Sequence, residues 1–139
     1  ASDRAALERF IAAWQSGDPD RLAAILAEDA QLAMPPEAGV YLGRTAIMRF
    51  LDRVVREAPA AYRMHAVAVN GSVGVALYKQ VTGDTFAPNG VSVLAIEAGL
   101  VTRIVRFAAS AELFARFGLP ASPPAIAADA TRFRSPTPS

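Results

Sequence analysis

The chain has 139 residues with one histidine and no cysteine, which suits one domain with its own core and excludes disulfides and thiolate chemistry. Hydrophobic residues make up 53% and charged residues 19%, which argues against disorder, yet no apolar run approaches the ~20 residues needed to cross a bilayer. The formal net charge is +1, and the scattered basic residues give no electrostatic footprint for nucleic acid, so we expect no nucleic-acid or membrane partner.

Two helices are predicted at the N-terminal end. Apolar residues at the spacing i, i+3, i+4 and i+7 indicate the first one, namely Leu7, Phe10, Ile11 and Trp14. This helix should end near Gly17. Asp18 then fits the N-cap of a second helix, and Pro19 fits its first position, where the missing N–H costs nothing. The start of the chain has no cationic segment followed by an apolar one, so no export signal is visible. The absence of cysteine fits a cytoplasmic protein, which is the location we expect.

A short strand and a third helix follow. The stretch "AQLAM" alternates enough for a short strand, which Pro35 and Pro36 stop because neither can donate to a β-ladder. The stretch "GRTAIMRFLDRVVREAP" predicts an amphipathic helix that is capped by Thr45 and closed by Pro59.

From residue 62 to residue 109 the pattern changes to strands rich in Val, Ile and Tyr. The strand-like runs are "YRMHAVAV", "SVGVALYKQV", "VSVLAIEA" and "LVTRIVRFAA". Turn signals separate them at Asn70-Gly71, in a loop from Gly83 to Gly90, and at Ala98-Gly99. This spacing predicts consecutive antiparallel strands.

A last short helix closes the predicted domain. Ser110 fits its N-cap, and Gly118 suits a left-handed C-cap. From Pro120 onward, prolines sit among Ala, Ser and Thr. We therefore expect one domain over residues 1–119 and an extended or disordered tail over residues 120–139.

The order of these elements predicts an α+β fold, in which helices cover one face of a curved antiparallel sheet. Such a sheet, closed at one end and open at the other, forms a cone. The mouth of the cone is the default ligand site.

Several stretches resemble a known family. They are "MPP" followed by "YLGRTAI", "RMHAVAVNGSVGVALY", "FAPNGVSVLAI" and "RFAASAELFARFGLP", which cover most of residues 20–120. They resemble the SnoaL-like branch of the nuclear-transport-factor-two-like superfamily, and more narrowly the C-terminal SnoaL-like domain of extracytoplasmic-function sigma-70 factors. The resemblance implies a cystatin-like α+β barrel. It also implies a regulatory or ligand-sensing role, with sigma-factor regions or RNA polymerase as partners.

The chain departs from that family pattern after the last predicted strand. An Asp-Pro pair commonly follows the aromatic residue there, whereas "AAS" follows Phe107 in this chain. Epoxide-hydrolase relatives use a buried Asp-Arg-Asp arrangement, and the strand arginines Arg63, Arg103 and Arg106 have no strand aspartates to match. Both departures weaken the transfer of acid–base chemistry from enzymatic relatives.

Aromatic and apolar residues are the main candidates for lining the cone. Met34 would end the first strand at its mouth, and Tyr41 would lie against the entrance. The expected ligand-binding residues are Trp14, Met34, Tyr41, Phe50, His65, Tyr78, Val93 and Phe107. Core packing explains Trp14 and the tyrosines equally well, so both interpretations stay open.

His65 is the candidate acid–base residue, because its reference pKa lies near neutrality. If its strand face lines the cone, it acts as a general base or hydrogen-bonds a ligand. The alternative is a partly buried histidine without a role. Asp52, Asp84 and Glu97 are expected to be solvated, and we expect neither a metal nor a cofactor.

Three functions follow as hypotheses. The leading one is a non-catalytic SnoaL-like sensor or interaction domain with an apolar cone for a small hydrophobic ligand. The competing one is an isomerase, cyclase or hydrolase for a polyketide- or steroid-like substrate, with His65 as base and Tyr41 or Tyr78 stabilising negative charge. The third is a structural module that pairs with its own copy through the convex sheet face, and we expect a homodimer of this kind.

Overall fold

The computed structural model describes residues 2–57, 62–69 and 71–123. Its helices are α1 (Ser2–Ser16), α2 (Pro19–Ile25), α3 (Arg44–Glu57) and α4 (Ala111–Arg116). Its strands are β1 (Leu26–Ala33), β2 (Val40–Leu42), β3 (Tyr62–Val69), β4 (Ser72–Thr82), β5 (Thr85–Glu97) and β6 (Leu100–Ala108). The tail expected from residue 120 lies outside the described residues from residue 124 onward.

The ends of α2 and α4 follow the local sequence. Asp18 has extended backbone angles and accepts a hydrogen bond from a backbone N–H in the first turn of α2, with Pro19 opening the helix. Ser110 caps α4 by accepting from the backbone N–H of Leu113. Gly118 follows α4 with a φ of +74°, the left-handed conformation that glycine adopts without strain. These caps confirm the sequence predictions.

The start of α3 differs from the predicted one. The helix begins at Arg44, so the predicted cap Thr45 already lies inside it, and the carbonyl of Gly43 accepts from the N–H of Ile47 at 3.1 Å. The N–H of Gly43 donates to the carbonyl of Ala30 at 2.7 Å. This bond ties the start of α3 to β1, a tertiary contact that the local sequence pattern does not contain.

The strands form one six-stranded sheet in the order β2-β1-β6-β5-β4-β3. β3, β4, β5 and β6 pair antiparallel in succession, which confirms the predicted meander, while β1 lies parallel to β6. The predicted loop from Gly83 to Gly90 is too long, because β5 begins at Thr85, and β1 begins at Leu26 instead of inside "AQLAM".

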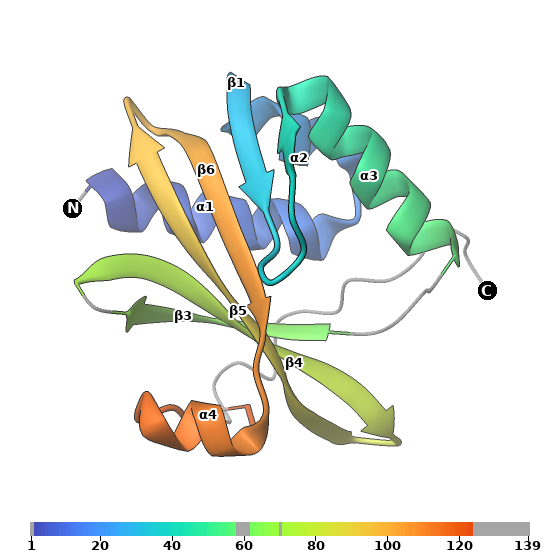
Figure 1. The fold of residues 1–139 in the computed structure, drawn as a ribbon, viewed down its shortest axis with the longest axis vertical. Coiled ribbons are helices and arrows are strands. Elements are labelled where there is room, and N and C mark those ends of the chain that lie inside the picture. The colour runs from blue at the N-terminus through green and yellow to red at the C-terminus, as the bar shows by residue number, and fades with distance from the viewer. Residues whose placement is uncertain (1, 58–61, 70, 124–139) are drawn as a thin grey trace.

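The sheet is strongly curved. β3 runs across the view in Figure 1, whereas β1 and β6 run down it. The pairing register shifts between Leu77 and Tyr78 on β4 and between Ala95 and Ile96 on β5. Such irregularities bend a strand and increase its twist, which gives the sheet a concave face.

Apolar side chains are buried on both faces of this sheet. The inner face packs against α1, α2 and α3. The core between them contains Val75 of β4, Leu7 of α1 and Ile47 of α3, each at most 1% exposed. The outer face is covered in part by α4, where Tyr78 and Phe114 are each 0% exposed. Figure 1 shows α4 at the opposite end of the molecule from α3. Helices thus cover one face through α1 to α3, as predicted, and α4 adds a cover on the other face.

The predicted α+β class, with a curved sheet packed against N-terminal helices, is therefore the class observed. Within the described segments, no helix combines the length and the apolar character that spanning a bilayer requires.

Candidate functional site

A cavity of about 200 Å³ lies between the inner face of the sheet and the helices α1 and α3. Its lining is mostly apolar and consists of Phe10, Trp14, Leu32, Met34, Phe50, Leu51, Val54, Tyr62, Met64, Val75, Leu77, Ser92, Ile104 and Arg106. Sites for drug-sized ligands usually measure roughly 300–1,000 Å³. The space therefore suits a molecule smaller than these.

The structure brings three of the predicted site residues to this cavity. Trp14 lines it from α1, Phe50 from α3, and Met34 from the residue that follows β1. The ring of Phe10 meets Trp14 edge-on, with centroids 6.3 Å apart, and so restricts the indole. Whether these three residues bind a ligand stays a prediction.

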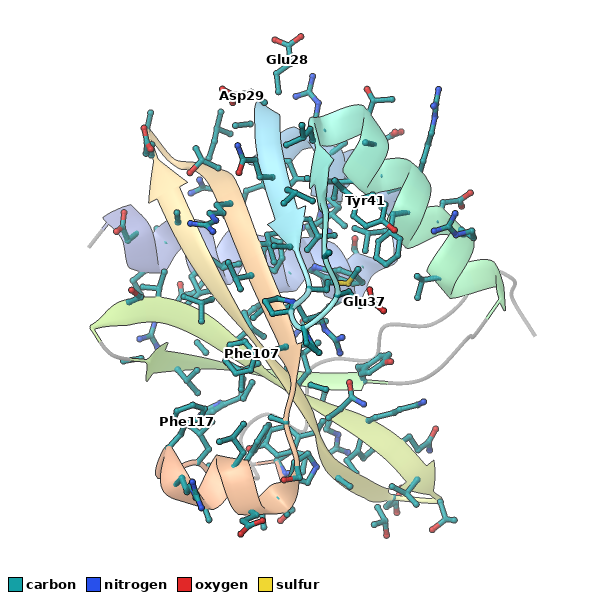
Figure 2. The ribbon with its side chains drawn as sticks, in the orientation of Figure 1. Glu28, Asp29, Glu37, Tyr41, Phe107 and Phe117 are labelled. Atoms are coloured by element: carbon teal, nitrogen blue, oxygen red, sulfur yellow. The ribbon has the colours of Figure 1, made fainter. Side chains whose placement is uncertain are left out.

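Tyr41 lies one layer behind the lining. Its ring packs against the ring of Phe50, with centroids 4.5 Å apart. Figure 2 shows Tyr41 between β2 and α3, with Glu37 below it at the tip of the β1–β2 connection. Tyr41 therefore supports a lining residue and does not itself line the cavity.

The other predicted site residues point away from the cavity, and they are His65, Tyr78, Val93 and Phe107. Met64 and Leu77 are cross-strand partners that line the cavity, so the next residue along each strand faces outward. The expectation that these four side chains line the cone is corrected by this geometry.

The second buried face explains the error. Tyr78 meets Phe114 of α4 edge-on, with ring centroids 5.3 Å apart. Phe107 similarly faces Phe117, at 6.5 Å between centroids, and Figure 2 shows Phe117 next to α4 with Phe107 above it, nearer to the sheet. When a sheet is apolar on both faces, alternation alone does not say which face is the inner one.

His65 sits half-buried on the outer face, opposite Ala76 of β4. Burial lowers the pKa of its imidazole below the ordinary value of 6.5, and the positive charge of Arg4 lowers it further. The ring is therefore neutral at pH 7. Because the sheet separates it from the cavity, it is not placed to act on a ligand there.

Two polar residues that the sequence analysis did not assign to the site face each other across β5 and β6. Ser92 and Arg106 are direct cross-strand partners, and both line the cavity. Arg106 donates a hydrogen bond of 2.6 Å from Nη2 to Oδ1 of Asn89. Residues two apart on a strand point to the same face. Arg106 could therefore have been placed on the inner face once Ile104 was known to lie there.

The polar side chains that line the cavity, Arg106, Ser92 and Tyr62, can all donate a hydrogen bond. Burial lowers the pKa of the Arg106 guanidinium, which stays charged at neutral pH all the same. Within the described part of the chain, no carboxylate lies within 4.0 Å of it. The lining includes Tyr62 as a third polar side chain, and no carboxylate or imidazole is among the described lining residues. The arrangement can bind an acceptor group but supplies no general base.

A second hollow of about 470 Å³ lies outside the cone, between α3 and the α1–α2 connection. Exposed polar side chains such as Arg49 and Asp52 contribute to its lining. Trp14 and Leu51 line both hollows and so form the wall between them.

The chain matches the SnoaL-like domain family over residues 7–104. The ECF RNA polymerase sigma factor SigG of Mycobacterium tuberculosis is 34% identical to it over 117 residues, which are 84% of this chain and 31% of SigG. The chain thus spans about a third of the length of this curated relative.

Solved structures have the same architecture. Bal32a, from a soil-derived mobile gene cassette, aligns with a TM-score of 0.63 at 21% identity and covers 84% of this chain and 95% of its own. A candidate ketosteroid isomerase from Kribbella flavida aligns with a TM-score of 0.62 at 23% identity and covers 99% and 91%. At such identities the likeness shows the fold alone. With the family match over residues 7–104, the chain belongs to the SnoaL-like domain family.

Proposed function

We propose that this SnoaL-like domain is a ligand-sensing regulatory domain, of the kind found at the C-terminus of sigma factors, whose cone takes up a small, largely apolar molecule. The observation that carries the proposal is the cavity between α1, α3 and the inner sheet face. Its described lining is apolar apart from a few hydrogen-bonding groups, and this composition is typical of sites that bind and orient a ligand.

The sigma-factor relative supports the regulatory part of this proposal. SigG matches 84% of the chain at 34% identity, whereas the solved structures cited above match at 21% and 23%. That likeness supports a role in tuning transcription, with sigma-factor regions or RNA polymerase as the proposed partners.

An isomerase, cyclase or hydrolase has less support, although the fold neighbours include a candidate isomerase. His65 and Tyr78 lie on the outer face of the sheet, and Tyr41 lies behind Phe50. The expected base and the expected stabilisers of negative charge therefore do not converge on one reacting atom in the cavity.

α3 offers a route from the cavity to the surface. Its residue Leu51 lines both the cavity and the outer hollow, as does Trp14 of α1. A ligand that shifts these two side chains changes the shape of a surface that a partner can contact. Such a ligand alters partner binding by its differential affinity for the two arrangements.

The test replaces the matched 117-residue segment of SigG with this chain and measures transcription in vitro. A second chimera carries Val54→Trp. Val54 lines the cavity and is 38% exposed, so a larger ring at this position narrows the cavity from its exposed side. Val81→Trp is the matched control, since Val81 is 61% exposed on β4 and lies outside the cavity.

We expect the chimera and its Val81→Trp variant to transcribe alike, and both to differ from SigG that lacks the segment. The Val54→Trp chimera should give a different output from the unmodified one. Equal transcription by all four proteins would remove the support for a regulatory role.

A further inference from the structure

We infer that the cavity takes a small organic anion, with an apolar body and one carboxylate whose oxygens accept hydrogen bonds from Arg106 and Ser92. This inference rests on the proposed function, because it names the class of ligand for the same cavity.

The charge of Arg106 is the first reason. The guanidinium lines an apolar cavity and is partly buried, and its one described hydrogen bond goes to the neutral amide oxygen of Asn89. A guanidinium has five N–H donors, so others remain for a ligand. Among the described residues no carboxylate lies within 4.0 Å of it. Burying a charge without a counter-charge is costly, and a bound carboxylate offsets that cost.

The hydroxyl of Ser92 is the second and independent reason. Ser92 is 6% exposed and lines the cavity. In the part of the chain that the structure describes, no residue hydrogen-bonds with its hydroxyl. Buried polar groups in folded proteins are nearly always paired, so a hydroxyl of this kind at a cavity wall indicates a ligand or water partner.

The two groups are placed to act on one anion. Ser92 and Arg106 are direct cross-strand partners, and side chains at such positions start about 4.5–5.5 Å apart at Cβ. Asn89 holds one side of the guanidinium. Gly90 leaves room for it, since a Cβ at this position would lie 3.4 Å from Nη2 of Arg106. The sheet itself therefore positions both donors.

The remaining lining defines the body of the anion. The rings of Trp14 and Phe50 and the side chain of Met34 offer an apolar surface. The volume of about 200 Å³ limits the body to about one aromatic ring or a short alkyl chain. Benzoate, phenylacetate and octanoate are suitable probes, and the corresponding amides have nearly the same shape without the charge.

Trp14 provides the readout, because it is the only tryptophan of the chain and lines the cavity. Its fluorescence is titrated with each acid and with each amide. We expect the acids to bind at least about tenfold more tightly than their amides, a factor that corresponds to about 1.4 kcal/mol. Arg106→Gln should abolish this preference. Arg103→Gln should keep it, since Arg103 is exposed on the same strand.

Further variants keep the test decisive if Arg106→Gln does not fold. Arg106→Lys retains the charge and should retain the preference for acids, whereas Ser92→Ala should weaken acid binding several-fold. Equal affinity for acids and amides in the unmodified chain overturns the inference and leaves the cavity as a ligand site. A preference that survives Arg106→Gln also overturns it. Absence of binding by every acid and amide counts against the inference and the sensing function together.

Discussion

The hydroxyl of Tyr78 donates a hydrogen bond of 2.9 Å to the backbone carbonyl of Pro120, 42 residues further along the chain. The ring of Tyr78 is 0% exposed and meets Phe114 of α4. Burial raises the pKa of the phenol, so the hydroxyl is protonated and able to donate at neutral pH. The bond fastens the chain after α4 to β4, which holds α4 over the outer face.

Substitution of Tyr78 tests this fastening. Tyr78→Phe should lower the free energy of unfolding by about 1 kcal/mol, because it removes one hydrogen bond and keeps the ring. Tyr78→Ala should lower it by about 3–5 kcal/mol, because it also leaves a cavity under α4. Urea denaturation measures both. Tyr41→Phe is the control and should change stability little; a Tyr78→Phe variant as stable as the unmodified chain would refute the role of the hydroxyl.

The part of the outer face that α4 leaves uncovered is the proposed dimer surface. Val105 of β6 points outward there, is half-buried in the single chain and belongs to neither buried cluster. We expect a homodimer in sedimentation experiments at micromolar concentration. Val105→Glu should give monomers, since a carboxylate at an apolar interface is costly, while Val81→Glu should not. An unmodified chain that is monomeric under these conditions would argue against this surface.

Local signals were enough to predict the start of α2 and both ends of α4. The caps at Asp18 and Ser110 and the left-handed Gly118 depend on residues within one turn, so the sequence pattern contains them. The position of α4 depends on tertiary packing instead. Nothing in the sequence of α4 states which sheet face it covers, and this choice decides which strand residues face the cone.

In the candidate site too, the helix residues could be predicted from local patterns, whereas the strand residues depended on tertiary packing. Trp14 and Phe50 were predicted correctly as residues on the inward faces of helices, because a helix in this fold has one apolar stripe. On β6, Val101 and Ile104 both belong to the inner core although they are three residues apart. Ala95 and Ile96 of β5 are adjacent but pair with Arg103 and Val101 of β6, so β6 has one extra residue, Thr102, which breaks the simple alternation. Arg106 was missed for this reason.

The pH dependence of stability should reveal His65. Its pKa is lowered in the folded state, so as the pH falls below about 6.5 the unfolded chain takes up a proton before the folded chain does. The contribution of His65 is therefore fully present above that pH and is lost as the pH falls toward its folded pKa. Since the chain has one histidine, His65→Gln should flatten the loss of unfolding free energy between about pH 7 and pH 5.5. An unchanged pH profile in urea denaturation would contradict this origin.

A side chain at Gly90 would affect both the stability of the sheet and the position of Arg106 in the cavity. A Cβ at this position would lie 2.8 Å from the backbone carbonyl oxygen of Phe107, closer than real side chains approach, so β5 and β6 would have to separate. Gly90→Ala should therefore lower the free energy of unfolding by about 1–3 kcal/mol. It should also weaken acid binding more than amide binding, because the same Cβ crowds Nη2 of Arg106 at 3.4 Å.

The control for Gly90→Ala is Ala95→Ser, at an exposed position of the same strand, which should change stability by no more than about 0.5 kcal/mol. Urea denaturation and the Trp14 fluorescence titration measure the two effects on one preparation. A Gly90→Ala variant that is stable and still prefers acids would show that β6 can move away without disturbing Arg106. In that case the guanidinium is positioned by Asn89 alone, and Asn89→Ala should then remove the preference that Gly90→Ala leaves intact.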